Sequence, residues 1–237
     1  MKTLSSSGKT VVVTGGTGAL GSAVTTRFLS EGATVVISYR QESELGMFGG
    51  APVDRFFPVH ADVTVQADVQ KLLDTAVAKT GHIDILVNTV GGYLPTKPLT
   101  EISELEWDHM MSINLKSTFL CTREALKRMA GHRYGRIVNI SAMAGLKPSS
   151  GKSAYAVAKS GVSLLTQIVA EEQRETGITI NAIAPDIIDT AANRKSMPGE
   201  DFTKWVKPDH IADMIFYFCS EAAGSISGTT LRVTGGI

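Results

Sequence analysis

The feature that most constrains this chain is a glycine-rich turn near its start, "TGGTGALG", which joins an apolar run to a helical one. The run before it, "TVVVT" (10–14), has the β-branched composition of a buried strand, and residues 19–31 have helical spacing. Gly15, Gly18 and Gly21 recur at every third position. Glycine can adopt φ values that other residues cannot, and its lack of a side chain lets a phosphate approach the backbone closely. The start of a helix also offers unpaired N–H groups to a phosphate. Between a first strand and a first helix, this triplet predicts dinucleotide binding rather than a purely structural turn.

The rest of the chain repeats this alternation of short β-branched runs and longer helical segments. Further strands are predicted at 34–38, 55–61, 83–88, 135–141, 178–184 and 229–233, and helices at 64–80, 103–130, 153–176 and 208–220. The helical region 103–130 is expected to bend around Ser112 to Asn114. Apolar strands alternating with helices predict a doubly wound parallel sheet covered on both sides, a three-layer α/β/α sandwich. Without repeats or a linker, residues 1–237 are expected to form a single domain.

Composition narrows the classes of function. Lys plus Arg and Asp plus Glu both number 23, and no basic tract occurs, which argues against binding nucleic acid or an anionic membrane. The apolar runs have strand length, far below a membrane span, and the N-terminus lacks the apolar core of a signal peptide. Cys121 and Cys219 are expected to be buried, reduced thiols, and the histidines show no metal-ligand spacing. We therefore expect a cytoplasmic protein without a metal.

The end of the second strand bears on which dinucleotide is bound. An acidic residue there would bond the ribose 2′-hydroxyl and repel a 2′-phosphate. In "VVISYRQ" that place is taken by Tyr39, followed by Arg40. Ser38 and Arg40 can accept a 2′-phosphate, which favours NADP(H) over NAD(H), unless Arg40 is only an exposed loop residue.

Other strand ends extend this groove. Asp62 and Val63 follow the third strand and are placed to flank an adenine, while Asn88 and Gly91 follow the fourth. Each residue alone is a weak signal. Together they form a line of candidate cofactor contacts along the carboxyl edge of the sheet.

The stretch "SAYAVAKSG" places Tyr155 and Lys159 on one face of a predicted helix. An ammonium near a phenol favours the phenolate and lowers its pKa, so the tyrosine could exchange a proton with a substrate near neutral pH. The lysine could also bond the nicotinamide ribose. Judged by spacing alone, a surface Tyr–Lys pair is the commoner explanation.

The segment 186–207 interrupts the alternation of predicted strands and helices. It is polar and carries Pro198 and Gly199. It follows a strand at the edge where ligands bind in doubly wound sheets, so it is a candidate substrate lid. The alternative is a solvated insertion.

Several motifs, taken in order and with their separations, resemble those of the short-chain dehydrogenase/reductase family. They are the glycine turn, "DV" at 62–63, "NTVGG", Asn114 in "SINL", "GRIVNIS", "YAVAK" and "INAIAPDIIDT". The resemblance extends from about residue 9 to the C-terminus. It implies a Rossmann-like fold with a seven-stranded parallel sheet, a nicotinamide cofactor, hydride transfer involving a small-molecule substrate, and a homo-oligomer, either a dimer or a tetramer.

The resemblance also implies roles for residues. Tyr155 corresponds to the catalytic acid/base, Lys159 to its activator and ribose ligand, and Asn114 to the residue that holds a proton-relay water. Pro185 to Thr190 correspond to the loop under the nicotinamide. Further cofactor contacts are expected at Thr17, Ala19, Leu20, Val90, Ile140, Ile187 and Ile188.

The chain departs from the family pattern at several positions. Ala19 stands where the family usually has a glycine, and the sequence "NTVG" stands where the family usually has "NNAG". Asp186 follows Pro185, where the family usually has a glycine, and adds an acidic group that is a candidate substrate contact. Ala142 occupies the place of the catalytic serine. Ser141 is adjacent, but a shift of one residue at a strand end turns the side chain to the other face. Ser141 could therefore serve only if the backbone bulges.

A narrower resemblance, to dihydropteridine reductases, covers the missing serine and the candidate lid. The lid motifs are Asp189–Thr190, Asn193–Arg194–Lys195, Met197–Pro198, Asp201–Phe202 and Trp205. Trp205 or Tyr93 could stack on a pterin-like ring. Those reductases are expected to prefer NADH and to carry an acidic residue after the second strand, unlike this chain.

The sequence therefore predicts an NAD(P)H-dependent reductase of a ketone or other carbonyl compound, with Tyr155 as general acid. The alternative within the class is reduction of a conjugated imine such as a pterin. A remote alternative is a dinucleotide-binding sensor that has lost catalysis.

Overall fold

Residues 5–236, which the computed structural model describes, contain a seven-stranded parallel sheet in the order β3-β2-β1-β4-β5-β6-β7. The strands are β1 (Thr10–Thr14), β2 (Thr34–Tyr39), β3 (Phe56–His60), β4 (Ile85–Asn88), β5 (Gly135–Ile140), β6 (Ile178–Pro185) and β7 (Thr230–Val233). The strand order reverses between β1 and β4, and ligands of such sheets bind outside the carboxyl ends of the strands at this reversal. The predicted Rossmann-like α/β fold is confirmed.

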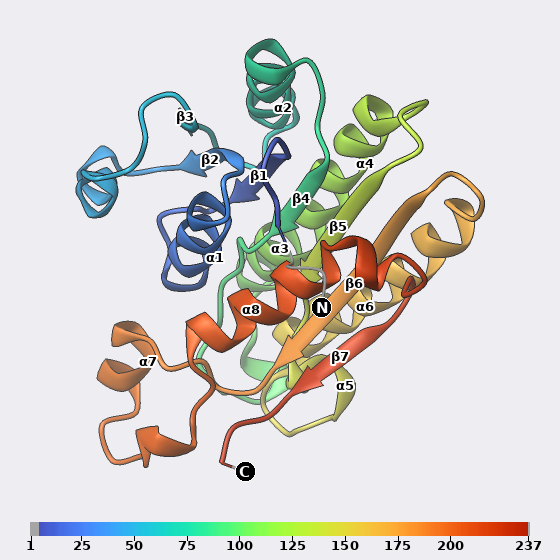
Figure 1. Ribbon diagram of the computed structural model, residues 1–237. Coiled ribbons are helices and arrows are strands. Elements are labelled where there is room, and N and C mark those ends of the chain that lie inside the picture. The colour runs from blue at the N-terminus through green and yellow to red at the C-terminus, as the bar shows by residue number, and fades with distance from the viewer. Residues whose placement is uncertain (1–4, 237) are drawn as a thin grey trace.

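Helices cover both faces of the sheet, as Figure 1 shows. The helices α1 (Ala19–Ser30) and α8 (Pro208–Phe218) pack on one face. The other face is covered by α2 (Gln66–Thr80), α4 (Ser117–Met129) and α6 (Ser153–Glu172).

Two apolar cores follow from the alternation of side chains along the strands. Val11 and Val13 of β1 face the core under α1 and α8, whereas Val12 faces the core under α2 and α4. All residues of β1 are buried, as expected for a central strand covered on both sides. This burial explains why the strands read as continuous apolar runs.

The long helical region bends where the sequence predicts it. The helix α3 (Glu104–Met111) begins at Ser103 with a capping box, and a π-helical turn, η3 (Ser112–Lys116), joins it to α4. Asn114 lies in this turn and is fully buried. Its Nδ2 donates to Met110 O at 3.1 Å, near the end of α3. A π-turn inside a helix is frequently found at a functional site.

Two of the element boundaries that differ from the sequence prediction have a clear local cause. The helix predicted at 64–80 begins at Gln66, because Thr64 N and Oγ1 both donate to Asp62 Oδ1 in a local turn. The helix predicted at 153–176 ends at Glu172, since Glu175 adopts a positive φ of 67° in the turn that follows.

Short helical elements without an apolar period were not predicted. They include the 3₁₀ segment η1 (Glu42–Phe48) and the short helix α5 (Met143–Leu146). Leu45 and Phe48 of η1 are half-buried against the core, and the Phe48 ring lies 4.9 Å from that of Phe56. This packing fixes η1 beside the carboxyl end of β2.

The segment 186–207 is folded rather than irregular. It contains α7 (Ala191–Ser196) and the 3₁₀ turn η4 (Phe202–Lys204), and Figure 1 shows α7 standing away from the sheet. Its two stems meet at a bridge between Ile188 and Val206. The segment therefore has fixed stems and a projecting tip, a shape that suits a lid.

Within residues 5–236, no helix is long and apolar enough to cross a membrane. In the same part of the chain, no cluster of His, Cys, Asp and Glu could hold a metal ion. Cys121 and Cys219 are buried free thiols, and burial raises the pKa of both. The cytoplasmic location stays a prediction.

Candidate active site

The glycine turn between β1 and α1 is held in shape by β2. Gly15 has a φ of 63°, its N–H donates to Ser38 Oγ at 2.8 Å, and Gly16 N–H donates to Ser38 O at 3.0 Å. A Cβ on Gly21 would lie 2.0 Å from Gly15 O, so only glycine allows this close approach. Among the described residues, no side chain caps the start of α1 at Gly18. The open helix start suits a pyrophosphate.

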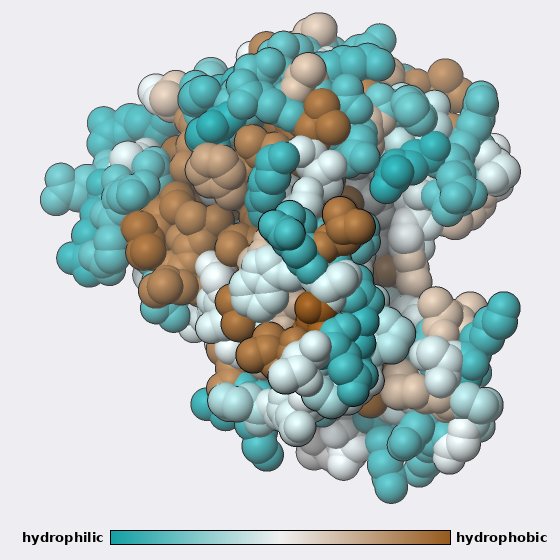
Figure 2. Space-filling model, turned by 180° about the vertical axis from the view of Figure 1, so that it is seen from behind, coloured by the Kyte–Doolittle hydropathy of each residue, from teal (hydrophilic) through white to brown (hydrophobic). Residues whose placement is uncertain are grey.

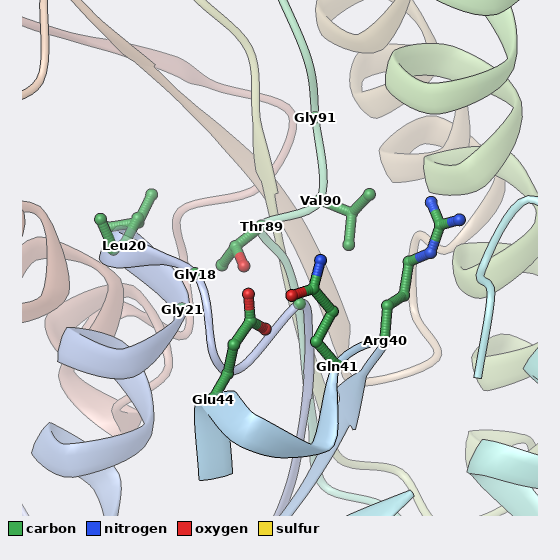
Figure 3. A pocket seen from close by; sticks show the side chains of 11 residues that line it. Gly18, Leu20, Gly21, Arg40, Gln41, Glu44, Thr89, Val90 and Gly91 are labelled. Carbon is green, nitrogen blue, oxygen red and sulfur yellow. The ribbon is translucent and has the colours of Figure 1, made fainter. Parts of the chain in front are cut away.

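A cleft of about 720 Å³ opens beside this turn, at the reversal of strand order. Its lining, most of which Figure 3 labels, consists of Gly15, Gly18, Ala19, Leu20, Gly21, Arg40, Gln41, Glu44, Thr89, Val90 and Gly91. Figure 2, which is turned by 180° from Figure 1, shows the surface hollowed on its right side, and this side corresponds to the left of Figure 1, where α7 is labelled. Most of the lining residues are among the predicted cofactor contacts, but Gln41, Glu44 and Thr89 are not.

The structure corrects the predicted roles of Ser38 and Asn88. Ser38 is only 2% exposed, and its hydroxyl already accepts the Gly15 N–H, so it braces the turn and does not face a 2′-phosphate. Asn88 is likewise buried, and its Nδ2 donates to Asn139 Oδ1 at 2.8 Å. Both side chains hold the strand ends together from within instead of lining the cleft.

One end of the cleft, beside the carboxyl end of β2, carries Arg40. Its side chain is 71% exposed, and its guanidinium lies 3.8 Å from Asp62 Oδ2. Partial burial raises the pKa of Asp62, but hydrogen bonds from Thr64 and the charge of Arg40 outweigh it and hold the pKa below its usual value. Val63 is buried beside Asp62, and the Tyr39 ring packs edge-on to His60 at 5.6 Å. Of the cofactor contacts predicted here, Arg40 is therefore the one that carries a strongly exposed positive charge.

At the other end of the cleft, Lys159, Asn114 and Gly91 converge. Lys159 is 4% exposed, and its Nζ donates to Ile140 O at 2.8 Å. A Cβ on Gly91 would lie 2.9 Å from Asn114 Oδ1 and 3.1 Å from Lys159 Nζ. Asn114 also exchanges hydrogen bonds with the backbone of Gly92. Gly91 thus allows three elements to meet at one point.

Tyr155 lies one turn before Lys159 on α6. The Lys159 Nζ is 6.0 Å from the centre of the Tyr155 ring. Burial raises the pKa of Tyr155 to about 12, and Tyr93 adds to this rise. Burial also lowers the pKa of Lys159 to about 8.

These pKa values correct the expectation that Lys159 lowers the pKa of Tyr155. The ammonium is engaged by Ile140 O and is itself costly to keep charged, so desolvation of the phenol dominates. Tyr155 therefore stays protonated at neutral pH, which is the form a proton donor needs.

The predicted substrate role of Ser141 is also corrected. Ser141 N–H still pairs with Ile183 O at 2.8 Å, so the strand continues without the bulge that would redirect the side chain. Its hydroxyl, 1% exposed, donates to Lys159 O at 2.8 Å and contacts Ser163 Oγ at 2.7 Å. The next residue, Ala142, has extended backbone and is buried. The site therefore lacks a hydroxyl from this strand end.

The other candidate substrate residues differ in exposure. Tyr93 is 53% exposed, and its ring lies edge-on to Tyr155 at 5.2 Å. The Asp186 side chain is exposed and accepts the N–H of Ile187, its own neighbour. Trp205 is only 7% exposed and packs on Phe202, which corrects its expected role as an open stacking surface.

The loop under the expected nicotinamide position is continuous with the segment 186–207. Pro185 ends β6 and is buried, and Ile187 and Ile188 are half-buried. The Thr190 hydroxyl accepts the Asn193 N–H and so caps α7. The hydroxyl of Thr17, a predicted cofactor contact in the glycine turn, also has a protein partner, because it donates to Glu44 Oε2 at 2.6 Å.

A parallel sheet with a glycine turn at its reversal, and a tyrosine and lysine beside the same crevice, defines a dinucleotide-dependent oxidoreductase. The family model described as short chain dehydrogenase matches residues 9–201. The chain therefore belongs to the short-chain dehydrogenase/reductase family and is an NAD(P)-dependent oxidoreductase.

Curated relatives and a solved structure agree with this assignment. The chain is 36% identical to (5R,7aS)-5-hydroxy-7a-methyl-1-oxo-2,3,5,6,7,7a-hexahydro-1H-indene-carboxyl-CoA reductase of Mycobacterium tuberculosis, over 96% of this chain and 92% of that protein. It is 31% identical to the 3-oxoacyl-[acyl-carrier-protein] reductase FabG of Rickettsia bellii, over 98% and 97%. The structure described as "ElxO with NADP Bound" superposes with a TM-score of 0.89, at 30% identity, over 96% of this chain and 98% of that one.

The glycine turn yields the first testable prediction. Gly21→Ala would place a methyl group 2.0 Å from Gly15 O and push α1 away from the turn. We expect the Kd for NADPH, measured by cofactor fluorescence, to rise at least about tenfold.

Gly50→Ala is the matched control, because nothing lies within 4 Å of the added Cβ. Its affinity for NADPH should match that of the wild type. A Gly21→Ala protein that is folded and binds NADPH normally would contradict a role for this turn in holding the cofactor.

Proposed function

We propose that the protein reduces a carbonyl compound with NADPH, and that Tyr155 donates the proton. The observation that carries this proposal is the meeting of Tyr155, Lys159, Asn114 and Gly91 at one end of the cleft beside the glycine turn. Both curated relatives described above are named reductases, and one acts on a 3-oxoacyl group, which contains a ketone.

The residues present fit a nicotinamide dinucleotide, because the glycine turn and Gly91 leave room along the cleft and Arg40 supplies a cation. Bound NADPH would supply the hydride, so that the carbonyl carbon gains this hydride, the oxygen gains the Tyr155 proton, and NADP⁺ is released. Lys159 stabilises the phenolate left on Tyr155 when its ammonium is charged. Asn114 holds the backbone of Gly92 in place, and its binding of a relay water remains part of the proposal.

Cofactor preference rests on Arg40. Its exposed guanidinium stands at the adenosine end of the cleft, where Tyr39 replaces the acidic residue expected of an NAD-preferring site. The similar structure with NADP bound supports the same choice. We therefore assign NADPH as the favoured cofactor.

A second candidate substrate is a conjugated imine of the pterin type. Two observations favour it: Ala142 provides no hydroxyl to polarise a carbonyl, and the half-exposed Tyr93 ring stands edge-on to Tyr155, where a planar substrate could lie against it. The third possibility, a sensor without catalysis, is disfavoured by the retained Tyr155 and Lys159.

Segment 186–207 is proposed as the substrate lid of a single domain that spans residues 1–237. Its tip, with α7, stands away from the sheet, while Asp189 and Arg194 form an ion pair at 2.5 Å that links its stem to α7. Gly235 packs so closely on this segment that a Cβ there would lie 2.0 Å from Lys204 O. Closure would therefore move the tip about fixed stems.

The protein is also proposed to form a homo-oligomer, a dimer or a tetramer, through the outer faces of α4 and α6. Phe119, Val157, Leu164 and Ile168 are 40 to 56% exposed there, and Figure 2 shows an apolar patch over these helices. A contiguous exposed apolar surface of this kind commonly marks a protein–protein interface. A second copy of the same face would bury it symmetrically.

Replacing Tyr155 tests the proposed reaction. In Tyr155→Phe the ring remains but the donated proton is lost, so we expect kcat for ketone reduction to fall at least about a hundredfold. NADPH affinity should stay near that of the wild type. The assay follows NADPH oxidation with a panel of ketones, 3-oxoacyl thioesters and quinonoid dihydropterin.

Ala142→Ser in the same panel separates the two substrate classes. Restoring a hydroxyl should raise the rate with ketones if a carbonyl is the substrate, and should leave dihydropterin reduction unchanged. Binding of NADPH without turnover of any compound, by wild type and Tyr155→Phe alike, would support the sensor and refute the reductase.

The proposed interface predicts that Leu164→Lys lowers the oligomer mass measured by light scattering. Burying the added charge would be costly, so the association should weaken. Leu105→Lys, at another exposed leucine outside this face, is the control and should keep the wild-type mass. A wild-type mass equal to that of one 25.2 kDa chain would refute the assembly.

A further inference from the structure

We propose that Glu44 is a second cofactor-specificity residue, which accepts a hydrogen bond from the adenosine ribose of NADH and lets the protein use NADH as well as NADPH. This inference rests on the proposed dinucleotide binding and extends it to the unphosphorylated cofactor. Glu44 lies on η1, beyond the strand end at which an acidic residue is expected.

The position of Glu44 is fixed by the structure on two sides. Its carboxylate accepts the Thr17 hydroxyl at 2.6 Å, which ties it to the glycine turn. On the far side of η1, Leu45 and Phe48 pack against the core. Figure 3 shows the Glu44 side chain reaching into the cleft next to Gln41, with Arg40 beyond it. The Glu44 side chain therefore has a fixed position in the cleft.

The remaining oxygen of Glu44 is available to a ligand. Thr17 binds Oε2, and within residues 5–236 no hydrogen bond reaches Oε1. A carboxylate accepts several hydrogen bonds, and a ribose with free 2′- and 3′-hydroxyls offers donors. The chemistry of this oxygen therefore suits an unphosphorylated ribose.

Arg40 and Glu44 give the same end of the cleft opposite preferences. A 2′-phosphate carries only acceptors and negative charge, so it is attracted by Arg40 and repelled by Glu44. A 2′-hydroxyl has the reverse preference, because it donates to the carboxylate and gains little from the guanidinium. Arg40 is loosely held, 3.8 Å from Asp62, so it can move toward a phosphate when one is present. The pair predicts that the protein binds NADH in addition to the favoured NADPH.

The test measures the Kd of NADH and of NADPH for the whole protein and its variants by cofactor fluorescence. Glu44→Gln keeps an acceptor for Thr17 but removes the charge. We expect NADH to bind about tenfold more weakly, the scale of one charge-assisted hydrogen bond, and NADPH to bind more tightly. Glu42→Gln, on the same segment but outside the cleft lining, removes an equal charge and should change neither Kd.

Two further variants separate charge from position. Glu44→Asp keeps the charge on a shorter side chain, so it should weaken NADH without tightening NADPH. Arg40→Asp should weaken NADPH relative to NADH. Thermal unfolding of each variant verifies that it is folded.

Three outcomes decide the matter. A shift in the NADPH-to-NADH affinity ratio in Glu44→Gln, absent in Glu42→Gln, supports the proposal. An unchanged ratio, or an equal loss for both cofactors, overturns it and makes Glu44 a brace for the turn. If the wild-type protein binds neither dinucleotide, the underlying proposal of dinucleotide binding fails instead.

Discussion

The hydrogen bond from Lys159 Nζ to Ile140 O is the contact on which the proposed catalytic end of the cleft depends. It crosses from α6 to the carboxyl end of β5 at 2.8 Å and is buried. An ammonium in such a place is costly unless its protons find acceptors. The bond therefore fixes where α6 meets the sheet, and with it the position of Tyr155 one turn earlier. Gly91 then allows Asn114 and the backbone after β4 to close around the same point.

Several polar side chains serve this arrangement without lining the cleft. Ser38 bonds the glycine turn to β2, Asn88 bonds β4 to β5 through Asn139, and Ser141 bonds the end of β5 to α6. Each of these side chains is buried and makes at least one hydrogen bond, although Asn88 Oδ1 has no partner among the described residues. They convert the carboxyl edge of the sheet into a rigid frame. The groups that can meet a ligand, namely Arg40, Glu44, Tyr93 and Tyr155, stand on that frame.

The sequence predicted the fold well because its signals are periodic. Apolar strands and amphipathic helices alternate, and even the bend near Asn114 could be placed. The glycine triplet predicted the turn beside the cleft because its spacing has a physical cause. The direction of polar side chains at strand ends was harder to predict. Ser38 and Asn88 stand at the expected positions, but the Ser38 hydroxyl bonds the glycine turn and the Asn88 amide bonds Asn139 of β5.

Other features had no readable signal. Glu44 lies in a 3₁₀ segment without apolar period, and only the packing of Leu45 and Phe48 brings it to the cleft. The pKa of Tyr155 depends on burial, which outweighs the charge of Lys159 and cannot be judged from their spacing. Whether Ser141 replaces the serine missing at position 142 could, in contrast, be judged from the alternation of side chains along a strand. The structure agrees with that judgement, because the Ser141 hydroxyl bonds Lys159 O and faces away from the site.

The central claim is that the buried ammonium of Lys159 supports proton donation by Tyr155. The most direct measurement is kcat for carbonyl reduction, at saturating NADPH, as pH rises through the Lys159 pKa of about 8. Below that pH the ammonium is present and stabilises the phenolate that forms; above it the charge is lost, so kcat should fall. Lys159→Met should be slow and should lack this step. A wild-type kcat that stays constant through this range, or a Lys159→Met protein that keeps the same step, would contradict the claim.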